Sequence, residues 1–187
     1  MIKVIVMIIL LAKSVLASPD PLDWTFPRDY SIHPKFNTEW WYFTGHLVDN
    51  KNQLHGFQLT FFRHGLQTNS DVSSPWFSKS LYTAHFGFTD GNKKTFFHES
   101  RSGREYFDQV NVQRDSLGLR LKDWSLKHHD GQFLINLVTS KGTFDLVLKP
   151  TKPLIFHGEN GVSFKNESKK NYSHYYSHTR LYGNGEF

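Results

Sequence analysis

The chain has 187 residues, carries a formal net charge of +5 and contains no cysteine. The lack of cysteine excludes disulfide bonds, zinc-thiolate sites and catalysis by a cysteine nucleophile. The positive charge is small and scattered, with no run of more than two Lys or Arg residues, so it does not predict nucleic-acid binding. Aromatic residues make up 16% of the chain, and this content predicts an all-β protein.

The first 17 residues have the pattern of a secretory signal peptide. Lys3 precedes an apolar run over Val4–Ala12, and Val15–Ala17 supplies residues suited to cleavage before Ser18. This apolar run is too short to span a bilayer of about 30 Å as a helix, and no other run is long enough. We therefore predict an exported protein, periplasmic or extracellular, without a transmembrane segment.

Residues 18–37 contain four of the seven prolines of the chain, Pro19, Pro21, Pro27 and Pro34. Proline has no backbone N–H group and interrupts a strand ladder. We therefore predict that residues 18–37 form an extended arm over a folded domain of residues 38–187.

The segment Thr38–Leu47 predicts a strand that is covered on both sides. Its aromatic and β-branched residues suit a pleated surface, and its side chains alternate between two faces. Glu39 heads a row that is otherwise apolar and includes Trp41, Phe43 and Leu47. The carboxylate of Glu39 is therefore either solvated at the strand end or placed in a cavity.

The next strand is predicted over Leu54–Arg63, after the turn signal Asp49–Asn52. Gln58 and Thr60 share one face of this strand, and we expect that face to be the polar-lined one. Functionally, Gln58 is suited to orient a water or a ligand oxygen, and a satisfied polar core residue is the alternative. His64–Ser80 has no periodicity and is predicted to be a loop.

The strand predicted over Tyr82–Thr89 places His85 on a row that we expect to face a pocket. A hydrogen-bonded core histidine is the alternative interpretation. The 11 histidines are poorly spaced for a metal site, because only His128 and His129 are adjacent and zinc needs three or four convergent ligands. We predict no metal and no other cofactor.

The rest of the chain is predicted to form short strands between turn signals, with a loop over Asn160–Lys170. About eight to nine antiparallel strands without an amphipathic helix are typical of a barrel or a sandwich. A barrel is favoured because eight strands enclose room for one small ligand. These further strands are predicted over Thr95–Ser100, Val110–Val112, Gly118–Lys122, Trp124–His128, Phe133–Thr139, Gly142–Lys149, Leu154–Gly158 and Asn171–Tyr182.

Several blocks of residues carry a resemblance to a known family. They are His33-Pro34, Asn37–Gly45 with Leu47, Phe57–Arg63, Ala84–Phe86, Asp123-Trp124, His157-Gly158 with Gly161, Ser163 and Lys165, and Tyr175–Ser177 with Thr179–Leu181. These blocks occur in the same order as in the lipocalin-like hydroxyneurosporene synthase group, which comprises carotenoid 1,2-hydratases and AttH-type domain proteins. The chain therefore resembles this group.

The resemblance implies a β-rich, lipocalin-like (calycin-like) antiparallel barrel, in a family whose members contain two related barrel halves. This sequence covers the first half, because the family's Trp-Met-Asp-His-Glu-Trp-like segment and second barrel would follow Phe187. The acid proposed for the hydratases and its neighbours belong to that later part, so no catalytic identity is carried over. The chain is therefore expected to be a fragment or a natural half-protein, and we favour a fragment.

A hydratase of this kind protonates an electron-rich C=C bond and lets water capture the cation, which requires a neutral carboxylic acid in a desolvated site. Glu39, between aromatic residues, is the candidate acid in this chain. In the structural alternative, Glu39 pairs with Arg63 or Arg180 on a neighbouring strand and holds one end of the barrel.

The last predicted strand contributes a row of phenols with Arg180, which either lines a ligand mouth or docks the second barrel. The sequence-based candidates for the ligand pocket are therefore Glu39, Trp41, Gln58, Thr60, His85, Tyr176 and Arg180.

Two functions from different classes follow from the sequence. The first is that of a hydratase-like protein, which in its full-length form adds water to an isoprenoid-type C=C bond. The second is that of a non-catalytic lipocalin-like module, which binds an apolar, isoprenoid or lipid-like molecule or supports a second barrel. The sequence does not decide between them.

Overall fold

The structure is a computed structural model that describes residues 22–66 and 78–187. The predicted signal peptide, the first part of the arm and most of the predicted loop His64–Ser80 lie outside these residues. No helix in the described ranges is long and apolar enough to cross a membrane. The predicted division at residues 17 and 37 stays a prediction.

The chain divides into two compact units. The larger unit consists of Trp24–Pro153 and His178–Phe187, and the described part of the smaller unit consists of residues 22–23 and Leu154–Ser177.

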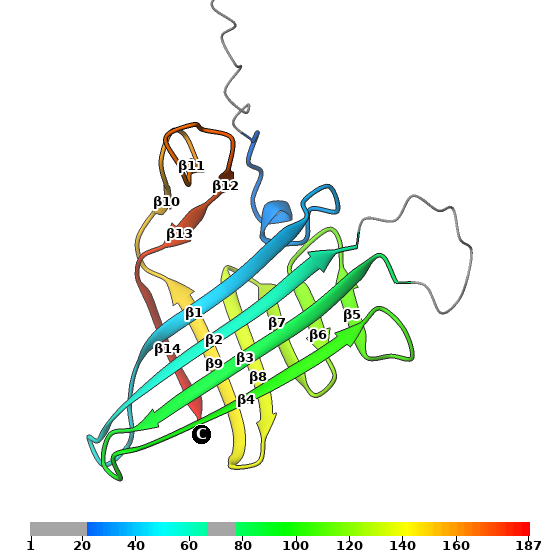
Figure 1. The fold of residues 1–187 in the computed structure, drawn as a ribbon. Coiled ribbons are helices and arrows are strands. Elements are labelled where there is room, and N and C mark those ends of the chain that lie inside the picture. Colours follow the sequence, from blue (N-terminus) through cyan, green and yellow to red (C-terminus); the bar gives the residue numbers. More distant parts are fainter. Residues whose placement is uncertain (1–21, 67–77) are drawn as a thin grey trace, which may run out of the picture. The chain divides into compact units, whose positions relative to one another are not determined.

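A four-stranded antiparallel sheet forms the first half of the larger unit (Figure 1). Its strands follow chain order, and the connections Asp49–Gln53 and Gly91–Lys94 are short turns that return the chain beside the strand that it has just left. Asp49 closes the first turn by accepting hydrogen bonds from the backbone N–H groups of Lys51 and Gln53. The strands are β1 (Thr38–Val48), β2 (Leu54–Gly65), β3 (Ser80–Asp90) and β4 (Thr95–Arg104).

A six-stranded antiparallel sheet forms the rest of the larger unit, in the order β14-β9-β8-β7-β6-β5. Only β14 leaves chain order, and it pairs with β9 from Leu181 to Glu186. The strands are β5 (Val110–Gln113), β6 (Gly118–Leu121), β7 (Trp124–His129), β8 (Gln132–Thr139), β9 (Gly142–Pro150) and β14 (Leu181–Glu186).

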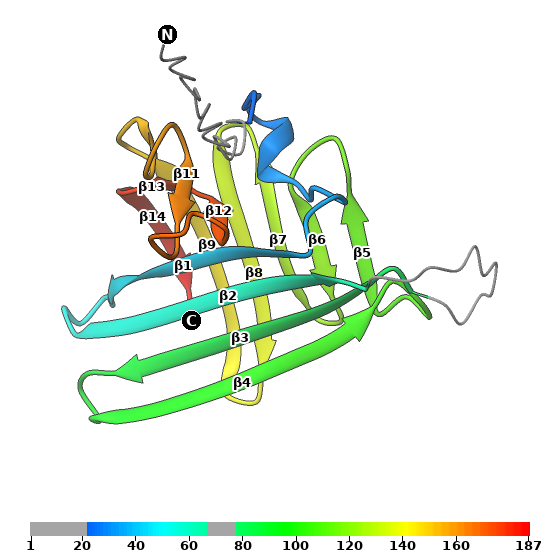
Figure 2. The same cartoon turned by 45° about the horizontal axis from the view of Figure 1, so that its top comes forward.

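The core of the larger unit lies between these two sheets, which Figure 2 shows as crossing layers. Phe86 of β3 is 1% exposed, and its ring lies 4.8 Å from that of Phe144 on β9 and 6.2 Å from that of Trp124 on β7. Phe43 of β1 lies 5.5 Å from Phe133 of β8 in the same way. Large aromatic side chains therefore fill the space between the sheets.

The all-β, antiparallel prediction is confirmed, but the predicted closed barrel is not found. Among the described residues, the strand pairings lie within each sheet and none joins one large sheet to the other. Side chains make the connection instead: Arg101 of β4 donates to Asp123 at 2.7 Å, and Glu99 accepts from Ser140 at 2.6 Å. The strand count also differs, because fourteen strands lie in the described ranges rather than eight or nine.

The polar row from which we drew the pocket candidates Gln58, Thr60 and His85 lies on the outer face of the four-stranded sheet. Gln58 and His85 are exposed, whereas Phe57 and Leu59 of the opposite row are buried. The prediction that His85 faces the interior is therefore wrong. The outer row of the two strands has Phe62 as its one Phe, Tyr or Trp, whereas the inner row has five such residues, and the sheet buries the row that removes more apolar surface from water.

The predicted strand Asn171–Tyr182 is three strands, interrupted at Tyr175 and at Thr179-Arg180. The alternation that placed Tyr176 and Arg180 on one face therefore does not run through the segment. In the smaller unit, β10 pairs with β13 and β11 with β12, and β11 lies within the predicted loop Asn160–Lys170. These strands are β10 (Leu154–Phe156), β11 (Val162–Phe164), β12 (Tyr172–His174) and β13 (Tyr176–His178).

Replacement of Phe86 by alanine is expected to lower the free energy of unfolding by about 3–5 kcal/mol, because it opens a cavity between the two sheets. The matched control is Phe96→Ala on the neighbouring strand, where the ring is 64% exposed and a change within about 1 kcal/mol is expected. Urea denaturation of both variants measures the difference, and equal losses would contradict the assigned core.

Candidate functional site

Glu39 lies at the start of β1 in a buried network of charges. Its Oε2 accepts a hydrogen bond from Nη1 of Arg63 at 3.0 Å, and both side chains are buried. Its Oε1 accepts from the backbone N–H group of His33 at 2.6 Å and lies 2.9 Å from Nδ1 of the same residue. Arg63 also donates to the carbonyl oxygens of Phe36 and Pro34, at 2.9 and 3.3 Å.

The His33 ring lies between two carboxylates. Nδ1 faces Glu39, and Nε2 lies 3.5 Å from Oδ1 of Asp29. Burial acts to lower the pKa of His33, but the hydrogen bond to Glu39 and the charges of Glu39 and Asp29 outweigh it, so the pKa is raised. For Asp29, burial acts to raise the pKa, and hydrogen bonds from Arg28 and Thr25 reverse that effect and lower it.

This geometry confirms the structural interpretation of Glu39, with Arg63 rather than Arg180 as its partner. Both carboxylate oxygens are bonded to protein groups, which leaves neither oxygen placed to meet a substrate. Arg180 is exposed. Glu39 therefore holds the proline-rich segment against the strand ends instead of presenting an acid to a cavity.

The other sequence-based pocket candidates do not converge. Thr60 is buried, but it shares the outer face of the four-stranded sheet with the exposed Gln58 and His85. Tyr176 is half-buried and belongs to the smaller unit. Trp41 is half-buried, and its Nε1 donates to the carbonyl oxygen of Tyr30 at 2.7 Å. Of these candidates, Trp41 is the one that is hydrogen-bonded to a residue of the pocket described below, Tyr30.

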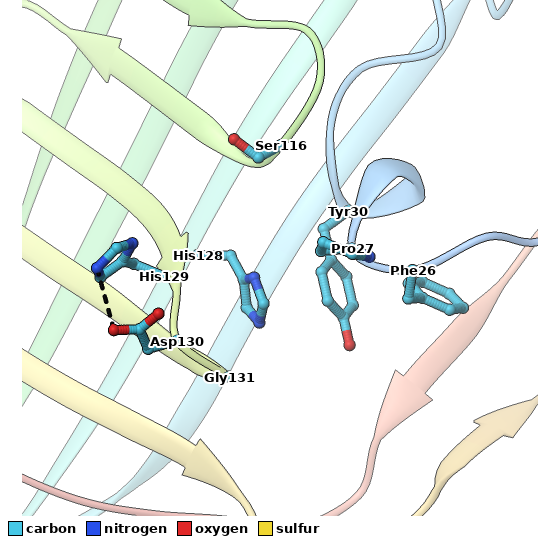
Figure 3. Close-up of a pocket in the computed structure, with 8 residues that line it drawn as sticks. All are labelled: Phe26, Pro27, Tyr30, Ser116, His128, His129, Asp130 and Gly131. Carbon is cyan, nitrogen blue, oxygen red and sulfur yellow. Dashed lines mark ion pairs between the residues drawn. The ribbon is translucent and has the colours of Figure 1, made fainter.

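A pocket of about 610 Å³ lies at one end of the six-stranded sheet (Figure 3). The segment around Tyr30, the turn after β5 and the turn between β7 and β8 each contribute to its wall. Tyr30 is the last residue of the short 3₁₀ helix η1 (Arg28–Tyr30). The lining residues are Phe26, Pro27, Tyr30, Ser116, His128, His129, Asp130 and Gly131.

Two rings of the pocket wall, Tyr30 and His128, pack against Phe133 and His178, which are not among the lining residues. The hydroxyl of Tyr30 is hydrogen-bonded to Nε2 of His178 at 2.8 Å, and the Tyr30 ring lies 4.6 Å from that of His128. Phe133 lies 5.1 Å from His128 and 5.7 Å from His178. Figure 3 shows the His128 and Tyr30 rings side by side, with the His129–Asp130 ion pair on the other side of His128.

The titratable groups of this wall are neutral near pH 7. Burial, and then the charge of His129, lower the pKa of His128; burial, and then the charge of His128, lower the pKa of His178. Burial raises the pKa of Tyr30. Around Tyr30 and His128 the pocket therefore offers aromatic surface and uncharged hydrogen-bonding groups, whereas Asp130 adds a carboxylate at the rim.

Sequence reasoning missed this pocket. His128 and His129 were considered as metal ligands only, and Tyr30 lies in a segment that was predicted to be an arm. The structure describes no cluster of three or more His, Asp or Glu side chains that could hold a metal ion within residues 22–66 and 78–187. The only sequence signal for the pocket is the histidine pair next to the Asp130-Gly131 turn.

Comparisons with known proteins place the chain in a family. The family model described as AttH-like matches residues 17–187. The chain belongs to the AttH-like family. The crystal structure of a putative AttH from Nitrosomonas europaea is similar, with 29% sequence identity and a TM-score of 0.73 over 86% of this chain. The AttH-like chain covers 48% of that protein, about half of its length. A search of curated proteins found no match.

Replacement of Glu39 by glutamine in the AttH-like chain is expected to lower the free energy of unfolding by about 3–5 kcal/mol, because it leaves the buried guanidinium of Arg63 uncompensated. Urea denaturation measures this loss. The double variant Glu39→Leu/Arg63→Met removes both charges and is expected to lose less than the single variant. A single variant as stable as the parent protein would contradict the role of the ion pair.

Two histidines are expected to affect stability with opposite dependence on pH. The raised pKa of His33 contributes stability below pH 6.5 that is lost as the pH rises through the folded-state pKa. The lowered pKa of His128 costs stability as the pH falls from 6.5 through the folded-state pKa. His33→Gln should therefore lower the stability of the protein more at pH 5 than at pH 8. His128→Phe should reduce the stability that the protein loses when the pH is lowered from 8 to 5.

Thermal unfolding between pH 5 and pH 8 tests both effects. The control variant is His85→Phe, which replaces a histidine at an exposed position on the outer face of the four-stranded sheet. The assignment fails if His33→Gln and His128→Phe change the profile in the same direction.

Proposed function

We propose that the AttH-like chain is a binding module that holds a small, largely apolar molecule in the pocket beside Tyr30. The observation that carries this proposal is the pocket of about 610 Å³ with its aromatic inner wall. Ligand sites are typically concave, of about 300–1,000 Å³, and mostly apolar with a few polar groups. Phe26, Pro27 and Tyr30 supply the apolar surface, and His128 and Ser116 supply the polar groups.

The space between the sheets is a less suitable site than this pocket. Large aromatic and aliphatic side chains occupy this space. Among the described residues, nine of the large side chains are less than 2% exposed. A ligand there would have to displace packed rings, and the loss of a large core side chain's packing costs several kcal/mol. The pocket at the end of the sheet requires no such displacement.

The second candidate is hydration of an isoprenoid-type C=C bond by the whole protein. Family membership and the resemblance to carotenoid 1,2-hydratases favour this candidate. Glu39 is bonded to Arg63 and His33, so we do not assign it as the acid of such a reaction. In this proposal, the family's second barrel partners the chain and supplies the acid.

We also propose that the protein is exported. The pattern of the first 17 residues supports export, and the absence of cysteine is compatible with a compartment in which disulfides would form.

The binding proposal is tested by titrating the full chain with farnesol, a C15 isoprenoid alcohol. Trp41 is hydrogen-bonded to Tyr30, so its fluorescence is expected to change saturably as the pocket fills. Ser116→Phe places a ring in the pocket and should abolish the response, whereas Ser100→Phe on the exposed face of β4 should retain it.

Two outcomes would contradict this function. A flat titration of the parent protein would contradict binding of isoprenoid ligands. Turnover of an acyclic prenyl alkene by the full chain in ¹⁸O-labelled water, with label in the product alcohol, would contradict a role limited to binding.

A further inference from the structure

His128 differs from the other polar side chains of the pocket wall because its ring has no protein hydrogen bond in the described part of the chain. The hydroxyl of Tyr30 is bonded to His178, and His129 is paired with Asp130 at 3.2 Å. His128 is half-buried, and contacts with Tyr30 and Phe133 at 4.6 and 5.1 Å hold its ring in place. A fixed, unpaired imidazole in a pocket is suited to bond a ligand.

We infer that the pocket selects apolar ligands that carry one neutral oxygen group, an alcohol or a carbonyl, and that His128 is the side chain that bonds this oxygen. The inference rests on the proposed binding function and adds the class of ligand. A neutral imidazole donates through one ring nitrogen and accepts through the other. A hydroxyl is able to match either nitrogen, and a carbonyl matches the donor.

The surroundings of His128 disfavour a charged ligand. Phe26, Tyr30 and Phe133 provide aromatic surface, and a carboxylate or ammonium group beside them would lose its hydration without a buried counter-ion. At the rim, Nε2 of His129 lies 3.2 Å from Oδ2 of Asp130, and the two side chains are 73% and 84% exposed. Asp130 would also repel a ligand carboxylate.

The hydrogen bond between Tyr30 and His178 holds the Tyr30 ring, which lies 4.6 Å from that of His128. The Nδ1 atom of His178 is buried without a hydrogen-bond partner among the described residues, so protonation of this ring would leave a buried charge with an unpaired N–H group. Burial also lowers the pKa of both His128 and His178. The wall is therefore built to stay uncharged at neutral pH.

The test compares four small isoprenoid probes that differ at one end: geraniol, geranic acid, geranylamine and the hydrocarbon myrcene. Isothermal titration calorimetry of the full chain at pH 7 measures their affinities. Geraniol is expected to bind about five- to tenfold more tightly than myrcene, because one additional hydrogen bond contributes about 1 kcal/mol. Geranic acid and geranylamine are expected to bind more weakly than geraniol.

The variant His128→Phe keeps an aromatic ring in the wall and removes both nitrogens. It is expected to eliminate the preference for geraniol over myrcene while retaining the affinity for myrcene. His85→Phe makes the same substitution at an exposed position on the other sheet and is expected to retain the preference. If His128→Phe fails to fold, the Cε1–Hε1 NMR signal of His128 in the parent protein gives a second readout, which should shift with geraniol and not with myrcene.

The outcomes separate this inference from the function on which it rests. If none of the probes binds, the proposed binding function fails and the inference fails with it. If the probes bind with equal affinity, or if the preference for geraniol survives in His128→Phe, the binding function stands and the role of His128 is overturned. Tighter binding of geranic acid or geranylamine than of geraniol overturns the neutral ligand class.

Discussion

The packing of aromatic side chains between the two large sheets is the constraint on which the rest of the structure depends. The ring of Phe86 lies 4.8 Å from that of Phe144 and 6.2 Å from that of Trp124 across the interface. Their burial provides a major part of the hydrophobic stabilisation in a chain without disulfides. Because these rings fill the interior, a ligand site has to lie at an end of the sheets, where loops and the proline-rich segment meet.

The buried charges near Glu39 matter to the pocket although they lie outside it. Arg63 bonds to Glu39 and to the carbonyl oxygens of Pro34 and Phe36, and this arrangement holds the segment that follows Tyr30. Trp41 bonds to the carbonyl oxygen of Tyr30 itself. The residue that first suggested catalysis therefore has a positioning role, in which it fixes the backbone that carries one wall of the pocket.

The pocket combines a fixed aromatic wall with polar groups that stay neutral, and this combination defines the ligands that we propose. The rings provide apolar contact with little loss of side-chain entropy, since neighbouring rings already hold them. The unpaired imidazole of His128 then adds discrimination, because a polar group that is left without a partner on binding costs free energy. Affinity and selectivity thus come from different atoms of the same wall.

The sequence by itself determined the antiparallel all-β class, the bounds of most strands to within a few residues, and the pairing of Glu39 with Arg63 as one of two alternatives. These properties depend on local alternation, on turn residues and on the pairing of neighbouring strands, all of which are short-range. The interpretation of the polar row of β2 and β3 as a pocket lining was wrong: the row with more aromatic residues faces the opposing sheet, because its burial removes more apolar surface from water. The sequence also did not reveal the pocket: Tyr30 and His178 are separated by 148 residues, and only the tertiary structure brings their side chains together.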